Sequence, residues 1–149
     1  MEAKNFRLGN WVLDSDREDP SLYQIVRIET KEYAEWNSGS EYNVIAKTEG
    51  SEDGYYDIIP SGIPLTEEYL VRFGFNDSEY KEGYIGIEFR TNLILDFVLT
   101  KPFKLGEWQK TYVCELGNSR FIQVEYVHEL QNLFFAFTTT ELELKKLRK

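Results

Sequence analysis

The stretch Val124–Phe137, VEYVHELQNLFFAF, decides how the rest of this chain is expected to fold. At roughly 100° per residue, six of its large apolar side chains fall within one arc of about 120°, and the polar ones fall outside that arc. The apolar set is Tyr126, Val127, Leu130, Leu133, Phe134 and Phe137, and the polar set is His128, Glu129, Gln131 and Asn132. This pattern predicts a helix that buries one side against a layer of strands.

Most of the chain before this helix has the patterns of β-strands. Alternating or continuous apolar runs, separated by turn residues, predict eight strands. They are Phe6–Leu13, Leu22–Ile28, Glu41–Thr48, Tyr55–Ile59, 85–90, Leu93–Leu99, Trp108–Leu116 and Ser119–Tyr126. Gly9-Asn10 marks a bend or bulge in the first strand, and Gly117-Asn118 is typical of a hairpin turn. The first two strands resemble the opening hairpin of a small SH3-like barrel.

A second helix is predicted by the stretch Ile63–Phe75, IPLTEEYLVRFGF. Thr66 is placed to cap its N-terminus, and Gly74 is placed to end it in the left-handed conformation. These signals predict a two-turn helix over Glu67–Phe73. Near the C-terminus, the leucine and glutamate alternation of residues 141–144 favours a last edge strand over a continuation of the long helix.

The sequence therefore predicts an α+β fold. It consists mainly of antiparallel strands, with an SH3-like N-terminal part, a short middle helix and a C-terminal helix packed on the sheet. A length of 149 residues fits one compact domain, residues 1–149. Pro60-Ser61-Gly62 allows a subdivision into a barrel-like part, 1–59, and an α+β part, 60–149.

The net charge and the cysteine content indicate which classes of partner and which cell compartment to expect. The net charge of −9 creates no field that attracts phosphate backbones or anionic lipid, so nucleic acid and membranes are disfavoured as partners. Cys114 is the single cysteine, which favours a reducing compartment. The N-terminus has no apolar run of signal-peptide length, and no window approaches the roughly 18 apolar residues of a membrane span. We expect a cytoplasmic protein.

Three stretches together resemble a known family. RLGNWVLDSD (Arg7–Asp16), IPLTEEYLVRFGF (Ile63–Phe75) and VEYVHELQNLFFAFT (Val124–Thr138) look like its signature blocks, which commonly read LRIGN, PIPLTEEWLLKFGF and YVHQLQNLYFALTG. The family comprises short proteins found widely in Bacteroidetes genomes, often in prophages or mobile elements. This chain departs from the blocks at Tyr69, Glu129 and Thr139, where Trp, Gln and Gly are usual. The resemblance implies provenance, and it implies no activity or functional residues.

Catalytic and metal-binding chemistry has little support in the residue patterns. His128 is the only histidine, which excludes any metal site that needs two. The acidic loop Asp14–Asp19 lacks the glycine and the final glutamate of a calcium loop. A Cys114–His128 nucleophile pair or a carboxylate such as Asp96 is the remaining enzymatic alternative, but each residue type is more often structural in such a setting. We expect no catalytic residues, no cofactor and no metal.

One side of the long helix is the candidate interaction surface. Phe135 falls on the polar side, next to His128 and Asn132 and close to Gln131. Either a second layer covers this side, which we favour, or an aromatic side chain is exposed for a partner.

Three hypotheses for function follow, and the first is preferred. The chain is a non-enzymatic accessory protein that binds a protein partner, or itself as a homo-oligomer. Alternatively, it is a small hydrolase-like enzyme that uses carboxylates or Cys114 with His128. The third hypothesis is nucleic-acid binding by the N-terminal part, which needs a local cluster of basic residues. The candidates for that cluster are Arg7, Arg17, Arg27 and Lys31.

Overall fold

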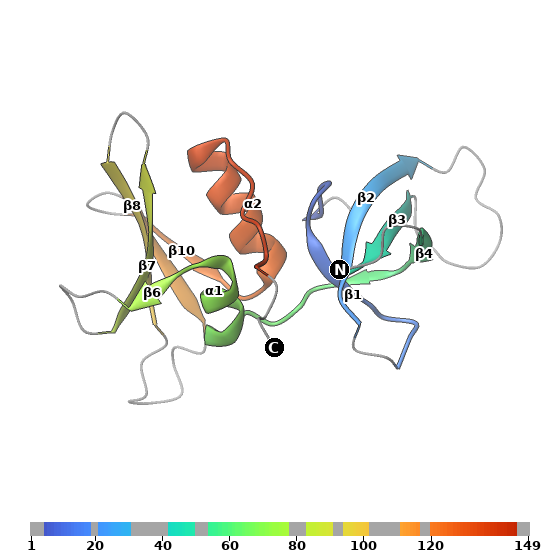
Figure 1. The fold of residues 1–149 in the computed structure, drawn as a ribbon, viewed down its shortest axis with the longest axis horizontal. Coiled ribbons are helices and arrows are strands. Elements are labelled where there is room, and N and C mark those ends of the chain that lie inside the picture. The colour runs from blue at the N-terminus through green and yellow to red at the C-terminus, as the bar shows by residue number, and fades with distance from the viewer. Residues whose placement is uncertain are drawn as a thin grey trace. The chain divides into compact units, whose positions relative to one another are not determined.

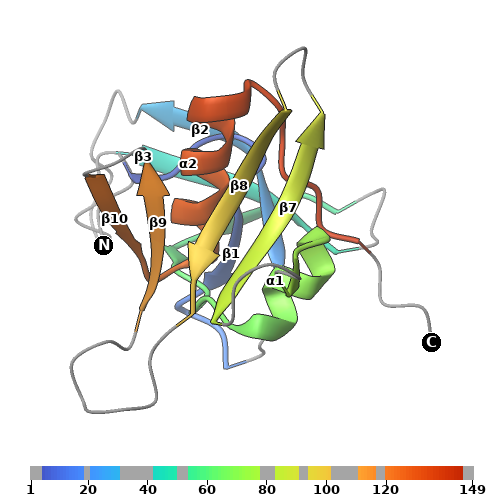
Figure 2. The same cartoon turned by 90° about the vertical axis from the view of Figure 1, so that its left-hand side faces the viewer.

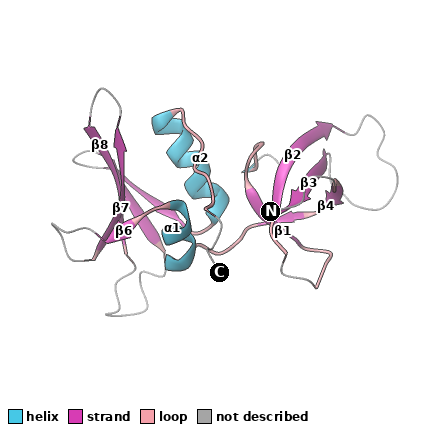
Figure 3. Cartoon of the chain, viewed as in Figure 1, coloured by secondary structure: helices cyan, strands magenta, loops and turns pink. Residues whose placement is uncertain are grey.

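The computed structural model describes residues 5–18, 21–30, 42–49, 54–77, 83–90, 94–101, 111–116 and 120–145 (Figure 1). Within these ranges, ten strands and two helices form two antiparallel sheets (Figure 3). The predicted α+β class with mainly antiparallel strands is confirmed. The chain divides into two compact units. The first unit comprises Met1–Ile63 with Tyr126–Leu133, and the second comprises Pro64–Glu125 with Phe134–Lys149. The single domain 1–149, with its subdivision at residue 59, stays a prediction.

The first unit contains a five-stranded antiparallel sheet in the order β4-β3-β2-β1-β5. The strands are β1 (Trp11–Asp14), β2 (Tyr23–Thr30), β3 (Tyr42–Thr48), β4 (Tyr56–Ile58) and β5 (Pro60–Ser61). Alternate side chains of these strands meet in one apolar core, as the two-residue period of a strand requires. The buried members are Phe6, Val12, Tyr23, Ile25, Val44, Ala46 and Ile58.

The first strand begins later than predicted. The turn at Leu8-Gly9 interrupts the predicted strand Phe6–Leu13, because Gly9 adopts a φ of 84° and its N–H donates to the carbonyl of Ile25 at 2.8 Å. That φ lies in the left-handed region, where glycine carries no steric cost. Among the described residues, β4 and β5 are the two ends of the sheet and do not pair with each other, so the sheet is not closed.

The second unit contains the other five-stranded antiparallel sheet, in the order β10-β9-β8-β7-β6 (Figure 2). Its strands are β6 (Asn76–Asp77), β7 (Tyr84–Arg90), β8 (Ile94–Thr100), β9 (Tyr112–Leu116) and β10 (Arg120–Val124). Leu116 pairs with Arg120 and Tyr112 pairs with Val124, so the predicted hairpin pairing is confirmed. The predicted turn residues Gly117-Asn118 lie outside the described residues.

Helix α1 (Glu67–Phe73) has the predicted bounds. Gly74 ends it with a φ of 92°, and the N–H groups of Gly74 and Phe75 donate to the carbonyls of Val71 and Leu70. This is the Schellman arrangement, which satisfies carbonyls that the helix leaves without an internal donor. The prediction for the other end is wrong in one respect, because the Thr66 side chain makes no capping hydrogen bond.

Helix α2 (Val127–Thr138) forms from the stretch that was expected to organise the fold. The Glu129 carboxylate accepts a hydrogen bond from the Tyr126 N–H at 3.1 Å, as the glutamate of a capping box does. Thr139 follows the helix with a φ of 55°.

Two expectations for the end of the chain differ from the structure. Phe137 lies on the predicted apolar stripe, yet 49% of its surface is exposed. Residues 141–145 form neither a strand nor a helix; the Lys145 N–H instead donates to the Arg72 carbonyl at 2.9 Å. Neither helix of the described ranges is long and apolar enough to cross a bilayer.

Candidate functional site

The residues of the predicted interaction surface fall into two groups. His128 and Gln131 are each 1% exposed, and Asn132 is half-buried. Phe135 is 38% exposed. The buried pair belongs to the first unit, whereas Phe135 belongs to the part of α2 assigned to the second unit. The four residues therefore do not form one continuous exposed patch.

Gln131 and Asn132 attach the start of α2 to the N-terminal segment of the first unit. The Gln131 side chain accepts from the Trp11 N–H at 2.9 Å and donates to the Gly9 carbonyl at 3.2 Å. The Asn132 carbonyl oxygen accepts from the Arg7 Nε at 2.7 Å. Amide side chains suit this position because they can satisfy backbone donors and acceptors together. A second layer therefore covers the polar side of the helix at His128 and Gln131, but the favoured burial of Phe135 is not observed, because 38% of its surface is exposed.

His128 lies between aromatic rings in the same unit. Its imidazole centroid is 4.5 Å from that of Phe6 and 5.7 Å from that of Tyr126. Its Nδ1 is buried and has no hydrogen-bond partner among the described residues. Burial lowers the pKa of His128 from its ordinary value of 6.5, and the Glu129 carboxylate partly opposes this effect. A neutral, buried imidazole is consistent with a structural role.

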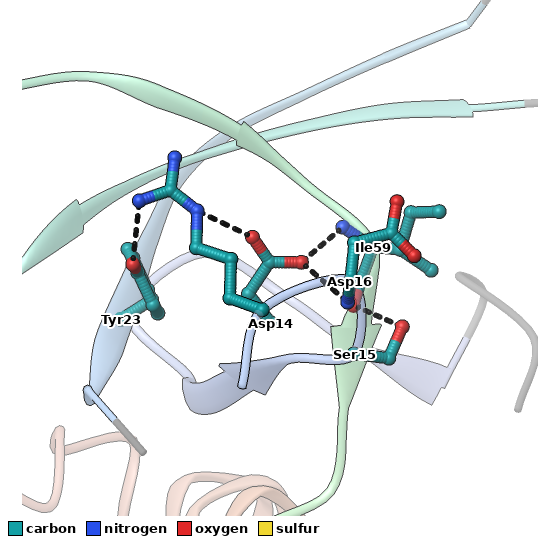
Figure 4. A network of polar contacts seen from close by, with 6 residues as sticks. Asp14, Ser15, Asp16, Tyr23 and Ile59 are labelled. Carbon is teal, nitrogen blue, oxygen red and sulfur yellow. Dashed lines mark hydrogen bonds and ion pairs between the residues drawn. The ribbon is translucent and has the colours of Figure 1, made fainter. Parts of the chain in front are cut away.

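A second polar network surrounds Asp14 at the end of β1 (Figure 4). Its carboxylate Oδ1 accepts from the N–H groups of Asp16 and Ile59, each at 3.2 Å, and Oδ2 lies 3.3 Å from the Arg17 Nε. The Ile59 carbonyl in turn accepts from the Ser15 N–H at 2.9 Å. Three donors satisfy this buried acid, so it holds the loop after β1 against the segment between β4 and β5.

A cavity of about 410 Å³ opens beside this network. This volume is within the range of about 300–1,000 Å³ that is usual for ligand sites. Its lining is part acidic and part apolar, and all of it belongs to the first unit. The lining residues are Asp14, Asp16, Arg17, Tyr42, Asn43, Val44, Asp57, Ile58, Ile59 and Pro60.

Sequence reasoning did not identify this cavity. Asp16 lies in the acidic loop that does not match the calcium-loop pattern, and Asp57 lies in a predicted strand to which no function was assigned. A signal was present in the alternation of Tyr55, Asp57 and Ile59, which predicts one shared face of a strand. The structure leaves all three exposed, with Tyr55 at 70% and Ile59 at 42%.

The residues of the enzymatic alternative are distributed over both units. Cys114 is a buried free thiol in β9 of the second unit, whereas His128 belongs to the first. Asp96 lies in β8, and its side chain is outside the described part of the structure. Within the described ranges, no three His, Cys, Asp or Glu side chains are grouped to hold a metal ion.

A charged cluster surrounds Lys101 in the second unit. Its Nζ lies 3.0 Å from a Glu67 oxygen and also contacts the Asp77 carboxylate. Hydrogen bonds to Asp77 and then to Glu67 raise the pKa of Lys101 above its ordinary value. Lys101 therefore remains protonated at neutral pH and is unsuited to act as a nucleophile or general base, each of which needs a lowered pKa.

The basic residues of the nucleic-acid alternative have internal partners where they are described. Arg7 donates to Asn132, and Arg17 pairs with Asp14. Arg27 lies 3.2 Å from Glu29, which offsets its charge. Lys31 lies outside the described residues.

No family model, curated protein or solved structure matches this chain. The resemblance to a Bacteroidetes family therefore stays a prediction based on the three sequence blocks.

Proposed function

We propose that this protein is a non-catalytic interaction module that binds a protein partner through its first unit. The observation that carries the proposal is the cavity of about 410 Å³ beside the exposed face of β4. This face presents Tyr55, Asp57 and Ile59. Aromatic and aliphatic side chains next to a concave surface are the usual anchors of protein interfaces.

An SH3-like arrangement of the first unit forms part of the proposal. Only Ile59 separates β4, which pairs with β3, from β5, which pairs with β1. The Ile59 N–H donates to the Asp14 carboxylate and the Ile59 carbonyl accepts from the Ser15 N–H, and these hydrogen bonds support a bend at Ile59. In small barrels, one bent segment can pair with strands from both sides of a sheet, which brings the sheet close to closure.

The biological setting rests on the sequence resemblance. We propose a prophage or mobile-element origin and a cytoplasmic location, with a host or phage protein as the partner. The net charge of −9 supports a partner with a basic surface over nucleic acid or anionic lipid. A homo-oligomer is the alternative form of the same interaction.

Affinity capture from the native host, with matched variants, tests this function. The double variant Tyr55→Ser/Ile59→Ser alters the proposed surface, and Phe135→Ala alters one exposed aromatic residue of α2. Val71→Ser is the control, since Val71 is a 57% exposed apolar residue of α1 in the second unit. We expect one protein to bind the parent and the Val71 and Phe135 variants, but not the Tyr55/Ile59 variant.

Two results would contradict this proposal. Loss of the partner only in the Phe135 variant would transfer the interaction surface to α2. Recovery of no specific protein or second copy by the parent, with unfolding curves equal for all variants, would refute the interaction module itself.

A further inference from the structure

The cavity of the first unit has two kinds of wall. Val44, Ile58 and Pro60 belong to β3, β4 and β5, so one part of the lining is apolar. Ile59 adds an apolar side chain that is 42% exposed. Such a surface can pack against the hydrocarbon part of a partner's side chain, and it leaves polar groups at the rim to select the partner's charge.

Some charged side chains of the cavity lining form ion pairs within the protein, and others do not. Arg17 and Asp14 are paired, and the guanidinium also lies over the rings of Tyr56 at 5.1 Å and Tyr23 at 5.9 Å. In contrast, the carboxylates of Asp16 and Asp57 are exposed and have no hydrogen-bond or ion-pair partner in the described part of the structure. The cavity therefore has two available negative charges and no available positive charge.

We propose that this cavity binds an extended segment of the protein partner through a lysine or arginine side chain, whose alkyl stem packs on Ile59 and Pro60. Asp16 and Asp57 receive its cationic head. This inference rests on the proposed function and specifies the chemistry of the partner. Long basic side chains suit the site because their stems cover apolar surface while their charged heads stay hydrated. The charge complementarity also steers a basic partner toward an acidic protein.

Selection from a displayed library of random twelve-residue peptides tests the inference on the whole protein. The library is offered to the parent, to D16N/D57N, and to the control E68Q/E143Q. Glu68 and Glu143 are exposed residues of the second unit, so the control makes the same change in net charge elsewhere. A selected peptide and its analogue with glutamine in place of Lys or Arg are then titrated at low and high salt.

The expected result is enrichment of Lys or Arg next to apolar residues by the parent and the control. Each exposed ion pair contributes at most about a fivefold change in affinity, so D16N/D57N should weaken binding by about tenfold. The glutamine analogue should weaken it similarly, and the parent's affinity should fall as salt rises, because salt screens exposed charges.

The contrary outcomes separate the inference from the proposed function. Selected peptides without basic residues, or equal affinity of the two peptides for the parent, would overturn the basic partner while leaving a binding module. Enrichment of acidic peptides would indicate that Arg17, and not Asp16 with Asp57, recognises the partner. Selection of no peptide by the parent or the control would overturn both the inference and binding through this cavity.

Discussion

Gln131 offers the sharpest test of how α2 is attached within the first unit. Its side chain is 1% exposed, accepts from the Trp11 N–H at 2.9 Å and donates to the Gly9 carbonyl at 3.2 Å. The Gly9 carbonyl has a second donor, the Gln24 Nε2 at 3.3 Å. Removal of the amide thus leaves the Trp11 N–H without this acceptor but does not leave the Gly9 carbonyl without a donor.

The substitution Gln131→Leu should destabilise the protein by about 1–3 kcal/mol at any pH, which is the cost of one unsatisfied buried donor. Gln131→Glu behaves differently because the introduced carboxylate must be buried or neutralised. Neutralising a carboxyl group whose unperturbed pKa is about 4.3 costs about 3.7 kcal/mol at pH 7 and about 0.2 kcal/mol at pH 4. The protonated group can still accept from Trp11 and donate to Gly9, as the amide does.

Urea unfolding of the parent and both variants at pH 7 and pH 4 measures these free energies. Protection of the Trp11 amide from hydrogen exchange reports the hydrogen bond itself. The Gln131→Glu penalty, taken relative to the parent at the same pH, should fall from about 3–4 kcal/mol to below about 1 kcal/mol as the pH is lowered. A pH-independent penalty for Gln131→Glu, or Trp11 exchange unchanged in Gln131→Leu, would refute this account of the attachment.

Three further predictions concern single residues within the helices or directly after them. Burial lowers the pKa of His128 below its ordinary value of 6.5. As the pH drops below 6.5, the unfolded chain therefore binds a proton before the folded protein does, and the free energy of unfolding falls by at most about 1.4 kcal/mol per pH unit. Urea unfolding of His128→Phe should lack this part of the pH dependence. Thr139→Gly should raise the unfolding free energy by about 0.5–1 kcal/mol, because Thr139 holds a φ of 55° that costs a β-branched residue more than glycine; an equal or lower value would contradict this reasoning. Gly74→Ala should lower the free energy of unfolding by about 1 kcal/mol or more, because Gly74 has a φ of 92° that strains a residue with a side chain. Unchanged thermal unfolding of this variant would argue against such strain.

Local sequence signals predicted α1 and the β9–β10 pairing correctly. The bounds Glu67–Phe73 and the left-handed Gly74 follow from interactions within about ten residues of the chain, so a short window of sequence contains the information. The pairing of β9 with β10 is equally local, since a short connection joins neighbouring antiparallel strands. The α+β class follows from the change of hydrophobic period between these strands and the helices.

The sequence by itself determined both helices and eight of the ten described strands, because those preferences depend on near neighbours. The two-residue strands β5 and β6 depend on the strands that they pair with. Only the tertiary structure decided that His128 and Gln131 are buried, since the layer that covers them comes from residues more than 100 positions away in the sequence. The same holds for the cavity, where a loop after β1 meets the segment at Ile59. A helical wheel places polar residues in solvent, because most polar residues are exposed. Here, backbone groups from a segment far away in the sequence need hydrogen-bond partners, so these polar side chains are buried instead.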